Sequence, residues 1–169
     1  ATAGDAQASV SFSAPASNGG SAITGYTVTS NPGGITAGGN GFTTSPITLS
    51  GLSNGTAYTF TVTATNAVGT STASAASNSV TPKANQTITF TNPGAQNFGT
   101  TPTLTASASS SLPVSFSSAT TGVCTITSGG SLTFITAGSC TINADQAGNA
   151  ATNAATTISQ SFLVNAVAP

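Results

Sequence analysis

The sequence predicts an all-β protein built from two tandem β-sandwiches, and three observations lead to this prediction. Residues 58–65 alternate strictly between apolar or aromatic side chains and threonine, which is the period of a strand with one buried face. Other short alternating runs recur along the chain, separated by clusters of Gly, Pro, Asn and Ser. The length of 169 residues accommodates two sandwiches of somewhat under ~100 residues each.

In the first half, alternation predicts a series of strands whose inward positions share one core. The strands are expected at residues 8–14, 23–30, 45–50 and 58–65, with at most a short edge strand at Ile35 and a final strand around residues 78–81. The inward positions of these runs are Val10, Phe12, Tyr26, Val28, Phe60 and Val62.

The turn before residue 58 carries a more specific signal. Leu52 is followed by the polar turn 53–56, in which Asn-Gly tolerates positive φ, and Tyr58 opens the next strand. This order predicts a tyrosine corner, in which the phenol hydroxyl of Tyr58 bonds to upstream backbone and joins two sheets.

The stretch from Leu52 to Gly69 resembles the fibronectin type III domain, whose pattern L-x-x-G-T-x-Y-x-F-x-V-x-A-x-N-x-x-G it matches at each specified position. The resemblance implies an immunoglobulin-like sandwich over residues 1–82, with Phe12 in place of the usual core tryptophan. It also implies a strand before residue 8. Since residues 1–5 are too few to supply it, we expect this first strand to be missing, either because the chain was cropped between domains or because a neighbouring subunit donates the strand.

The second half follows a short linker, residues 83–85, and is predicted to form a second sandwich over residues 86–165. Residues 166–169 are expected to be a linker to a following domain or subunit. Strands are predicted near residues 86–91, 103–107, 113–117, 123–127, 131–136, 139–145 and 156–164. The expected core positions are Ile88, Phe90, Val114, Phe116, Phe134, Ile142, Phe162 and Val164.

Four segments of this half resemble the bacterial immunoglobulin-like repeats of large surface and secreted proteins. They are QTITF from Gln86, SSLPVSFSS from Ser110, TAGSCTINADQAGN from Thr136, and SQSFLV near the end. The resemblance implies a second immunoglobulin-like sandwich.

Two cysteines fall on inward positions of predicted strands in this half. Cys124 shares a face with Ile126, and Cys140 shares a face with Ile142. We therefore predict a Cys124–Cys140 disulfide, which would stabilise the fold by roughly 3 kcal/mol on the chain-entropy model. A disulfide in a chain rich in Ser, Thr and Gly indicates an oxidising, extracellular or cell-surface location; two buried free thiols in a cytosolic protein are the less consistent alternative.

The near absence of charge excludes several functions. Asp5, Lys83 and Asp145 are the only charged side chains, so no basic cluster can capture nucleic acid or an anionic membrane. Without His, Glu or Arg, the chain can form neither a Ser-His-Asp triad nor a histidine-ligated metal site. No apolar run approaches the ~20 residues of a membrane span. We expect no catalytic, cofactor or metal site, no membrane insertion and no enzymatic activity.

The remaining hypothesis is a structural, non-enzymatic repeat module of a bacterial extracellular protein: an adhesin stalk, a cell-surface array or a self-assembling filament. The alternative is a spacer in a secreted polysaccharide-degrading enzyme. The expected partners are neighbouring tandem domains or copies of the same chain, which could donate a strand into the incomplete first sheet. Glycans on Ser and Thr are a further expectation. A ligand-binding adhesive domain would need a pocket or exposed aromatic cluster, and only Phe42 and Phe98 are candidates for exposure.

Overall fold

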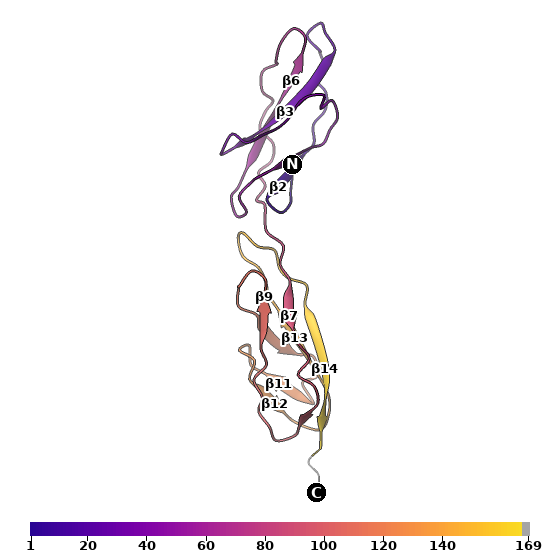
Figure 1. The fold of residues 1–169 in the computed structure, drawn as a ribbon, viewed down its shortest axis with the longest axis vertical. Coiled ribbons are helices and arrows are strands. Elements are labelled where there is room, and N and C mark those ends of the chain that lie inside the picture. Colours follow the sequence, from indigo (N-terminus) through magenta and orange to yellow (C-terminus); the bar gives the residue numbers. More distant parts are fainter. Residues whose placement is uncertain (167–169) are drawn as a thin grey trace. The chain divides into compact units, whose positions relative to one another are not determined.

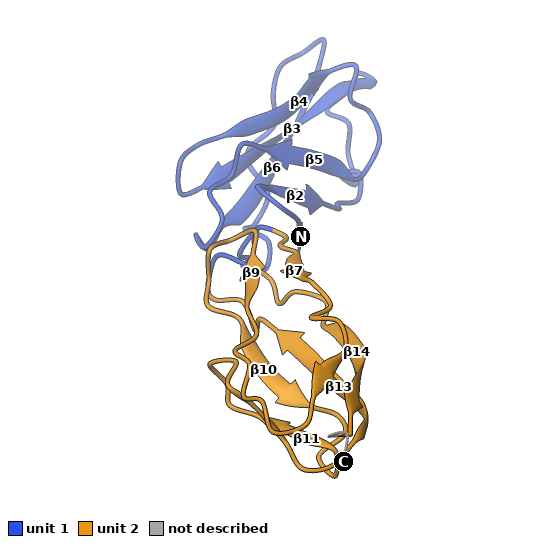
Figure 2. Ribbon diagram, turned by 60° about the horizontal axis from the view of Figure 1, so that its bottom comes forward, with its two compact units in different colours: residues 1–84, 150–152 blue, residues 85–149, 153–169 orange. Residues whose placement is uncertain are grey.

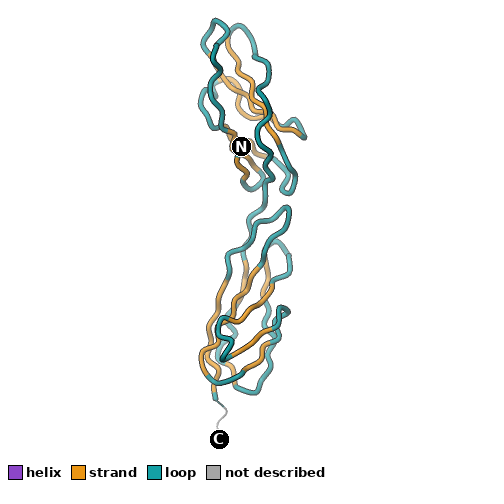
Figure 3. Tube along the Cα trace, turned by 180° about the vertical axis from the view of Figure 1, so that it is seen from behind, coloured by secondary structure: helices purple, strands orange, loops and turns teal. Residues whose placement is uncertain are grey.

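The computed structural model describes residues 1–166, and the secondary structure of these residues consists of strands, turns and loops without a helix (Figure 3). The chain divides into two compact units, unit 1 (residues 1–84 and 150–152) and unit 2 (residues 85–149 and 153 onward) (Figure 2). The boundary between Ala84 and Asn85 falls inside the predicted linker, residues 83–85. The predicted linker at residues 166–169 lies, apart from Ala166, outside the described residues.

Unit 1 is a sandwich of two three-stranded antiparallel sheets (Figure 1). One sheet has the order β1-β2-β5 and the other has the order β4-β3-β6. The strands are β1 (Thr2–Ala3), β2 (Gln7–Val10), β3 (Ile23–Asn31), β4 (Thr36–Asn40), β5 (Ile47–Ser50) and β6 (Thr59–Asn66).

The predicted core positions of unit 1 face the space between these sheets. Val10, Tyr26, Val28 and Phe60 are buried, as are Leu49 and Leu52. Two predicted positions, Phe12 and Val62, are only half-buried and pack against the edge of this cluster. The alternation of apolar and threonine side chains accounts for the result, because successive residues of a strand point to opposite faces.

The expectation that the first strand of unit 1 is missing is wrong. β1 pairs with β2 through Thr2 opposite Ser9 and Ala3 opposite Ala8. The chain reverses between the two strands in a tight turn, in which the Gly4 N–H donates to the Gln7 carbonyl at 2.8 Å. Ala6 adopts a positive φ of 51° in this turn, and its N–H is bound by Asn54 Oδ1 at 2.9 Å. A contact from a residue 48 positions away thus supports a strand too short to show a period of its own.

The prediction of a last strand of unit 1 around residues 78–81 is also wrong. Only an isolated antiparallel bridge joins Val80 to Tyr58, and a second joins Thr70 to Thr65. Between these bridges, the segment 70–80 runs along β6 with serine hydroxyls in its hydrogen-bond ladder. This departs from a strand because the contacts recur every third residue.

Unit 2 contains a four-stranded sheet with the order β10-β13-β14-β8 and two two-stranded sheets, β7-β9 and β11-β12. All pairs are antiparallel except β8 with β14, which are parallel. The strands are β7 (Ile88–Phe90), β8 (Gln96–Asn97), β9 (Ala106–Ala108), β10 (Ser115–Ser118), β11 (Cys124–Ile126), β12 (Leu132–Phe134), β13 (Gly138–Asp145) and β14 (Ile158–Asn165).

The start of unit 2 is divided between two sheets. β7 pairs with β9, whereas β8 pairs with β14 after the turn at residues 92–94. Asn92 holds this turn, because its Nδ2 donates to the Ser161 carbonyl at 2.8 Å and its Oδ1 accepts from the Gly94 N–H at 2.9 Å. One continuous segment therefore contributes to both layers of the sandwich.

The predicted core of unit 2 is gathered into one cluster. Ile88, Phe90, Phe134, Ile142, Phe162 and Val164 are buried, while Val114 and Phe116 are half-buried against them. The ring centroids of Phe90 and Phe116 lie 5.4 Å apart, and those of Phe134 and Phe162 lie 6.4 Å apart. Both ring pairs adopt the edge-to-face geometry that aromatic quadrupoles favour. The fold class predicted from the sequence, two immunoglobulin-like sandwiches, is confirmed.

Candidate functional site: the locks between sheets

The tyrosine corner of unit 1 forms around Tyr58. Its phenol oxygen accepts a hydrogen bond from the Ser53 N–H at 3.1 Å, five residues upstream. Leu52 and Tyr58 are both buried, and the Leu52 N–H donates to the Ala6 carbonyl at 3.0 Å. Gly55 has a φ of 85° in the intervening turn, which only glycine adopts without cost. The corner links the β5-to-β6 connection to the chain that carries β1 and β2.

The disulfide of unit 2 joins two sheets covalently. Cys124 lies on β11 and Cys140 on β13, with their Cα atoms 5.8 Å apart. Both cysteines are completely buried within the hydrophobic cluster. The predicted pairing is therefore present. Because β11 belongs to the β11-β12 pair and β13 to the four-stranded sheet, the bond holds the two layers together even when hydrogen bonds open.

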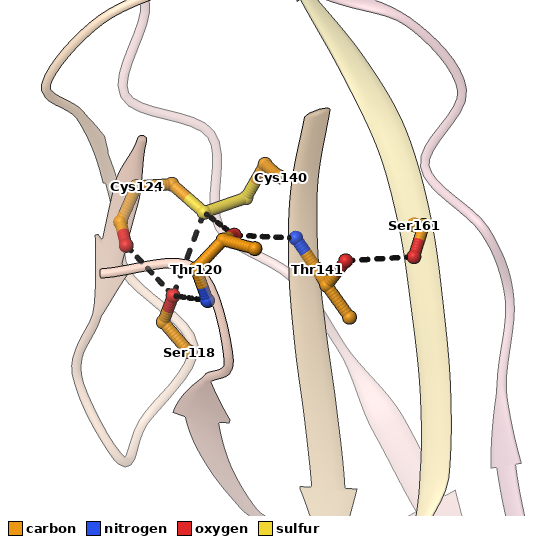
Figure 4. The surroundings of a disulfide bond; sticks show 6 residues. All are labelled: Ser118, Thr120, Cys124, Cys140, Thr141 and Ser161. Atoms are coloured by element: carbon orange, nitrogen blue, oxygen red, sulfur yellow. Dashed lines mark hydrogen bonds between the residues drawn. A yellow bond between two sulfur atoms is a disulfide. The ribbon is translucent and has the colours of Figure 1, made fainter. Parts of the chain in front are cut away.

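Two hydroxyl groups, those of Ser118 and Thr120, lie beside the Cys124 sulfur of this disulfide (Figure 4). Thr120 Oγ1 lies 3.4 Å and Ser118 Oγ 3.6 Å from the Cys124 sulfur. Ser118 Oγ donates to the Cys124 carbonyl at 2.7 Å, and Thr120 Oγ1 accepts from the Thr141 N–H at 2.8 Å. The loop before Cys124 is thereby fastened to both strands that the disulfide connects.

Sequence reasoning missed Ser118 and Thr120. Their only signal is a pair of hydroxyl residues a few positions before the cysteine, in a chain where Ser and Thr are abundant throughout. It also missed Ser71, Ser74 and Ser77, whose spacing of three residues is visible in the sequence but matches neither the strand nor the helix period.

Each of the two carboxylates accepts a hydrogen bond from a neutral side chain. Asp5 Oδ1, in unit 1, accepts from Asn54 Nδ2 at 2.9 Å. Asp145 Oδ1, in unit 2, accepts from the Thr157 hydroxyl. Over residues 1–166, His, Cys, Asp and Glu side chains form no group of three that could hold a metal ion. The two carboxylates belong to different units, so neither unit contains a carboxylate pair.

Two hollows, one found in unit 1 and another in unit 2, are bordered by neutral side chains. The hollow of unit 1 measures about 370 Å³ and lies between the loops at residues 15–19 and 66–71. The hollow of unit 2 measures about 430 Å³ and lies between residues 89–93 and 103–107. Phe42 is 54% exposed in unit 1 and Phe98 is 37% exposed in unit 2, as expected, and neither borders a hollow.

No curated protein sequence matches the chain.

In the described part of the chain, no helix is both long and apolar enough to cross a membrane.

Two solved structures are similar to this chain over most of its length. A C-terminal 282-residue fragment of intimin, in complex with the translocated intimin receptor's intimin-binding domain, is 16% identical, with 94% of this chain and 57% of that chain covered and a TM-score of 0.43. The FN1–FN3 domains of chicken CNTN1 are 14% identical, with 98% and 64% covered and a TM-score of 0.45. The chain thus spans less than two thirds of either. The family model that matches is that of the fibronectin type III domain, and it covers residues 1–80.

Proposed function

We propose that this chain is a structural, non-enzymatic repeat module of a bacterial extracellular protein, such as an adhesin stalk, a cell-surface array or a filament. Its work is mechanical: it sets distance and resists unfolding. Unit 2 acts in this proposal as a bacterial immunoglobulin-like repeat, following the sequence resemblance. The partners are neighbouring tandem domains or copies of the same chain.

The observation that carries the proposal is the buried Cys124–Cys140 disulfide. Such a bond forms and persists in oxidising compartments and is rare in the cytosol. It crosses between the sheets of unit 2, where it limits how far the unit can extend under force. The charged residues form no cluster that could serve a catalytic or metal site. The proposal therefore depends on the tyrosine corner and the disulfide, which connect the sheets.

Assembly by strand donation is the weaker version of this proposal. It requires an open edge beside β2, and β1 already occupies that edge at Ser9 and Ala8. We therefore favour association of neighbouring domains through their ends or faces.

Single-molecule force spectroscopy of the chain tests the mechanical proposal. Cys124 and Cys140 are 16 residues apart in the sequence, and their disulfide keeps the loop between them closed when unit 2 unfolds. Since an extended chain spans about 3.3–3.6 Å per residue and the bonded Cα atoms are already 5.8 Å apart, reduction should lengthen the unfolding step of unit 2 by roughly 50 Å, whereas the step of unit 1 should not change.

The location is tested separately. An antibody raised against the chain should label the surface of intact source cells or the material that they secrete. Labelling confined to permeabilised cells, together with free thiols at Cys124 and Cys140 in protein isolated under thiol-blocking conditions, would contradict the proposal.

A further inference from the structure

The edge of the β4-β3-β6 sheet beyond β6 is closed by the segment 70–80, which we call the serine segment. Three of its residues, Ser71, Ser74 and Ser77, recur every third position. Their N–H groups donate to the carbonyls of Ala64, Val62 and Phe60 at 2.8, 2.9 and 2.8 Å. Every second residue of β6 is therefore matched to every third residue of the serine segment.

The serine side chains complete the same ladder. The N–H groups of Ala64, Val62 and Phe60 donate to the hydroxyl oxygens of Ser71, Ser74 and Ser77 at 3.0, 3.0 and 3.1 Å. In an ordinary antiparallel ladder, backbone carbonyls would accept these bonds. Here a hydroxyl takes the place of a carbonyl at three consecutive positions.

Each of the three serine hydroxyls also donates a hydrogen bond to a backbone carbonyl of its own segment. Ser71 Oγ donates to the Thr72 carbonyl at 2.9 Å, Ser74 Oγ to the Ala75 carbonyl at 2.8 Å, and Ser77 Oγ to the Asn78 carbonyl at 2.7 Å. An added strand needs donors and acceptors that repeat every second residue, about 6.6–6.8 Å apart. The serine segment presents a three-residue repeat in which the carbonyls of Thr72, Ala75 and Asn78 already accept hydrogen bonds.

Proteins usually protect such edges with charge, most often with lysine. This chain has a single lysine, Lys83, and it lies outside the serine segment. We propose that the serine segment is an uncharged seal, which prevents a second copy of this chain from adding a strand at the β6 edge. The seal is independent of the proposed extracellular function, because it follows from the hydrogen bonding alone.

The test compares two double variants of the full 169-residue chain. Ser74→Ala/Ser77→Ala removes two hydroxyls of the ladder, whereas the control Thr72→Ala/Ser79→Ala removes two hydroxyls of the same segment that accept no bond from β6. We expect amide exchange at Val62 and Phe60 to accelerate at least tenfold in the first variant only. We also expect concentration-dependent oligomers by light scattering in the first variant and a monodisperse control.

A charge rescue separates the seal from a general loss of stability. Adding Ala73→Lys/Ala76→Lys to the serine variant should restore the monodisperse state while leaving amide exchange at Val62 and Phe60 fast, because charge protects the edge without rebuilding the ladder. If the serine variant stays monodisperse despite fast exchange, or if the lysines fail to reverse its association, the seal is refuted. Unchanged exchange in the serine variant would refute the ladder itself. The extracellular location and the disulfide are untouched by any of these outcomes.

Discussion

Unit 1 joins its sheets through a phenol hydrogen bond and side-chain packing, whereas unit 2 joins its sheets through a disulfide. The two units also differ in the polar side chains that face each other on neighbouring strands. In unit 2, facing strands carry paired polar side chains: Thr141 with Ser161 at 2.7 Å, and Asn143 with Ser159 at 2.7 Å. In unit 1, Thr27 faces Thr63 across β3 and β6 with no hydrogen bond between their side chains, whereas the hydroxyls of Thr65 and Thr70 lie 3.1 Å apart.

This contrast shows two ways to hold a sandwich with almost no charge. The chain has only three charged side chains, and exposed ion pairs contribute little to stability. Unit 1 relies on burial and on backbone groups bound by hydroxyls and amides, so its stability is entirely non-covalent. Unit 2 adds a covalent constraint, so part of its stability depends on redox conditions.

The largest expected effect is the loss of a core aromatic. Phe60→Ala in unit 1 should cost about 3–5 kcal/mol, because it leaves a cavity at a side chain only 1% exposed. Tyr26 and Tyr58 are the only tyrosines and the chain has no tryptophan, so intrinsic fluorescence during urea unfolding reports on unit 1 alone. Phe42→Ala, at a side chain 54% exposed, is the control and should change the free energy of unfolding by less than about 0.5 kcal/mol.

Reduction of the disulfide should follow in size and should affect only unit 2. The chain-entropy model gives a loss of about 3 kcal/mol for a closed loop of this length. We expect far-UV circular dichroism, which reports on both units, to show a transition that moves to lower urea in reductant. The tyrosine fluorescence transition should stay in place, and a matching shift there would show that the units do not unfold independently.

Opening the tyrosine corner should have a smaller effect, confined to unit 1. Tyr58→Phe keeps the ring but removes the acceptor of the Ser53 N–H, which should cost about 1 kcal/mol. The remaining Tyr26 still provides the fluorescence signal. An unchanged midpoint in Tyr58→Phe would mean that water replaces the phenol oxygen at no cost.

The smallest effects should separate the two outer faces. Ser161→Ala breaks the exposed bond to Thr141 in unit 2 and should destabilise by a few tenths of a kcal/mol, within the ~0.5 kcal/mol typical of surface substitutions. Thr63→Ser in unit 1 removes a methyl group and should cost about as little. If Ser161→Ala leaves the thermal unfolding midpoint of unit 2 unchanged, the Thr141–Ser161 pair does not contribute measurably.

How far the sequence predicts the structure depends on the type of interaction. Strict alternation located β6 and its buried Phe60, because the strand period is a local property of the backbone, although Val62 is only half-buried. The inward parity of Cys124 and Cys140 located the disulfide for the same reason. β4 was predicted only as a short strand at Ile35, since Gly38 and Gly39 leave it without an apolar pattern.

Several features could not be predicted because they depend on residues far apart in the chain. β1 has two residues, and its turn is held by Asn54 from the tyrosine corner. In unit 2, β7 and β8 join different sheets, and the turn between them depends on the hydrogen bond from Asn92 to the Ser161 carbonyl in β14. No local period encodes such contacts.

The sequence by itself determined the all-β class, the two cores and the pairing of the cysteines, since alternation and side-chain chemistry act within each strand. Only the tertiary structure decided how the edges are completed. The serine segment shows the physical reason: a hydroxyl can take the place of a carbonyl in a ladder only when the neighbouring strand presents its free N–H groups at the matching spacing.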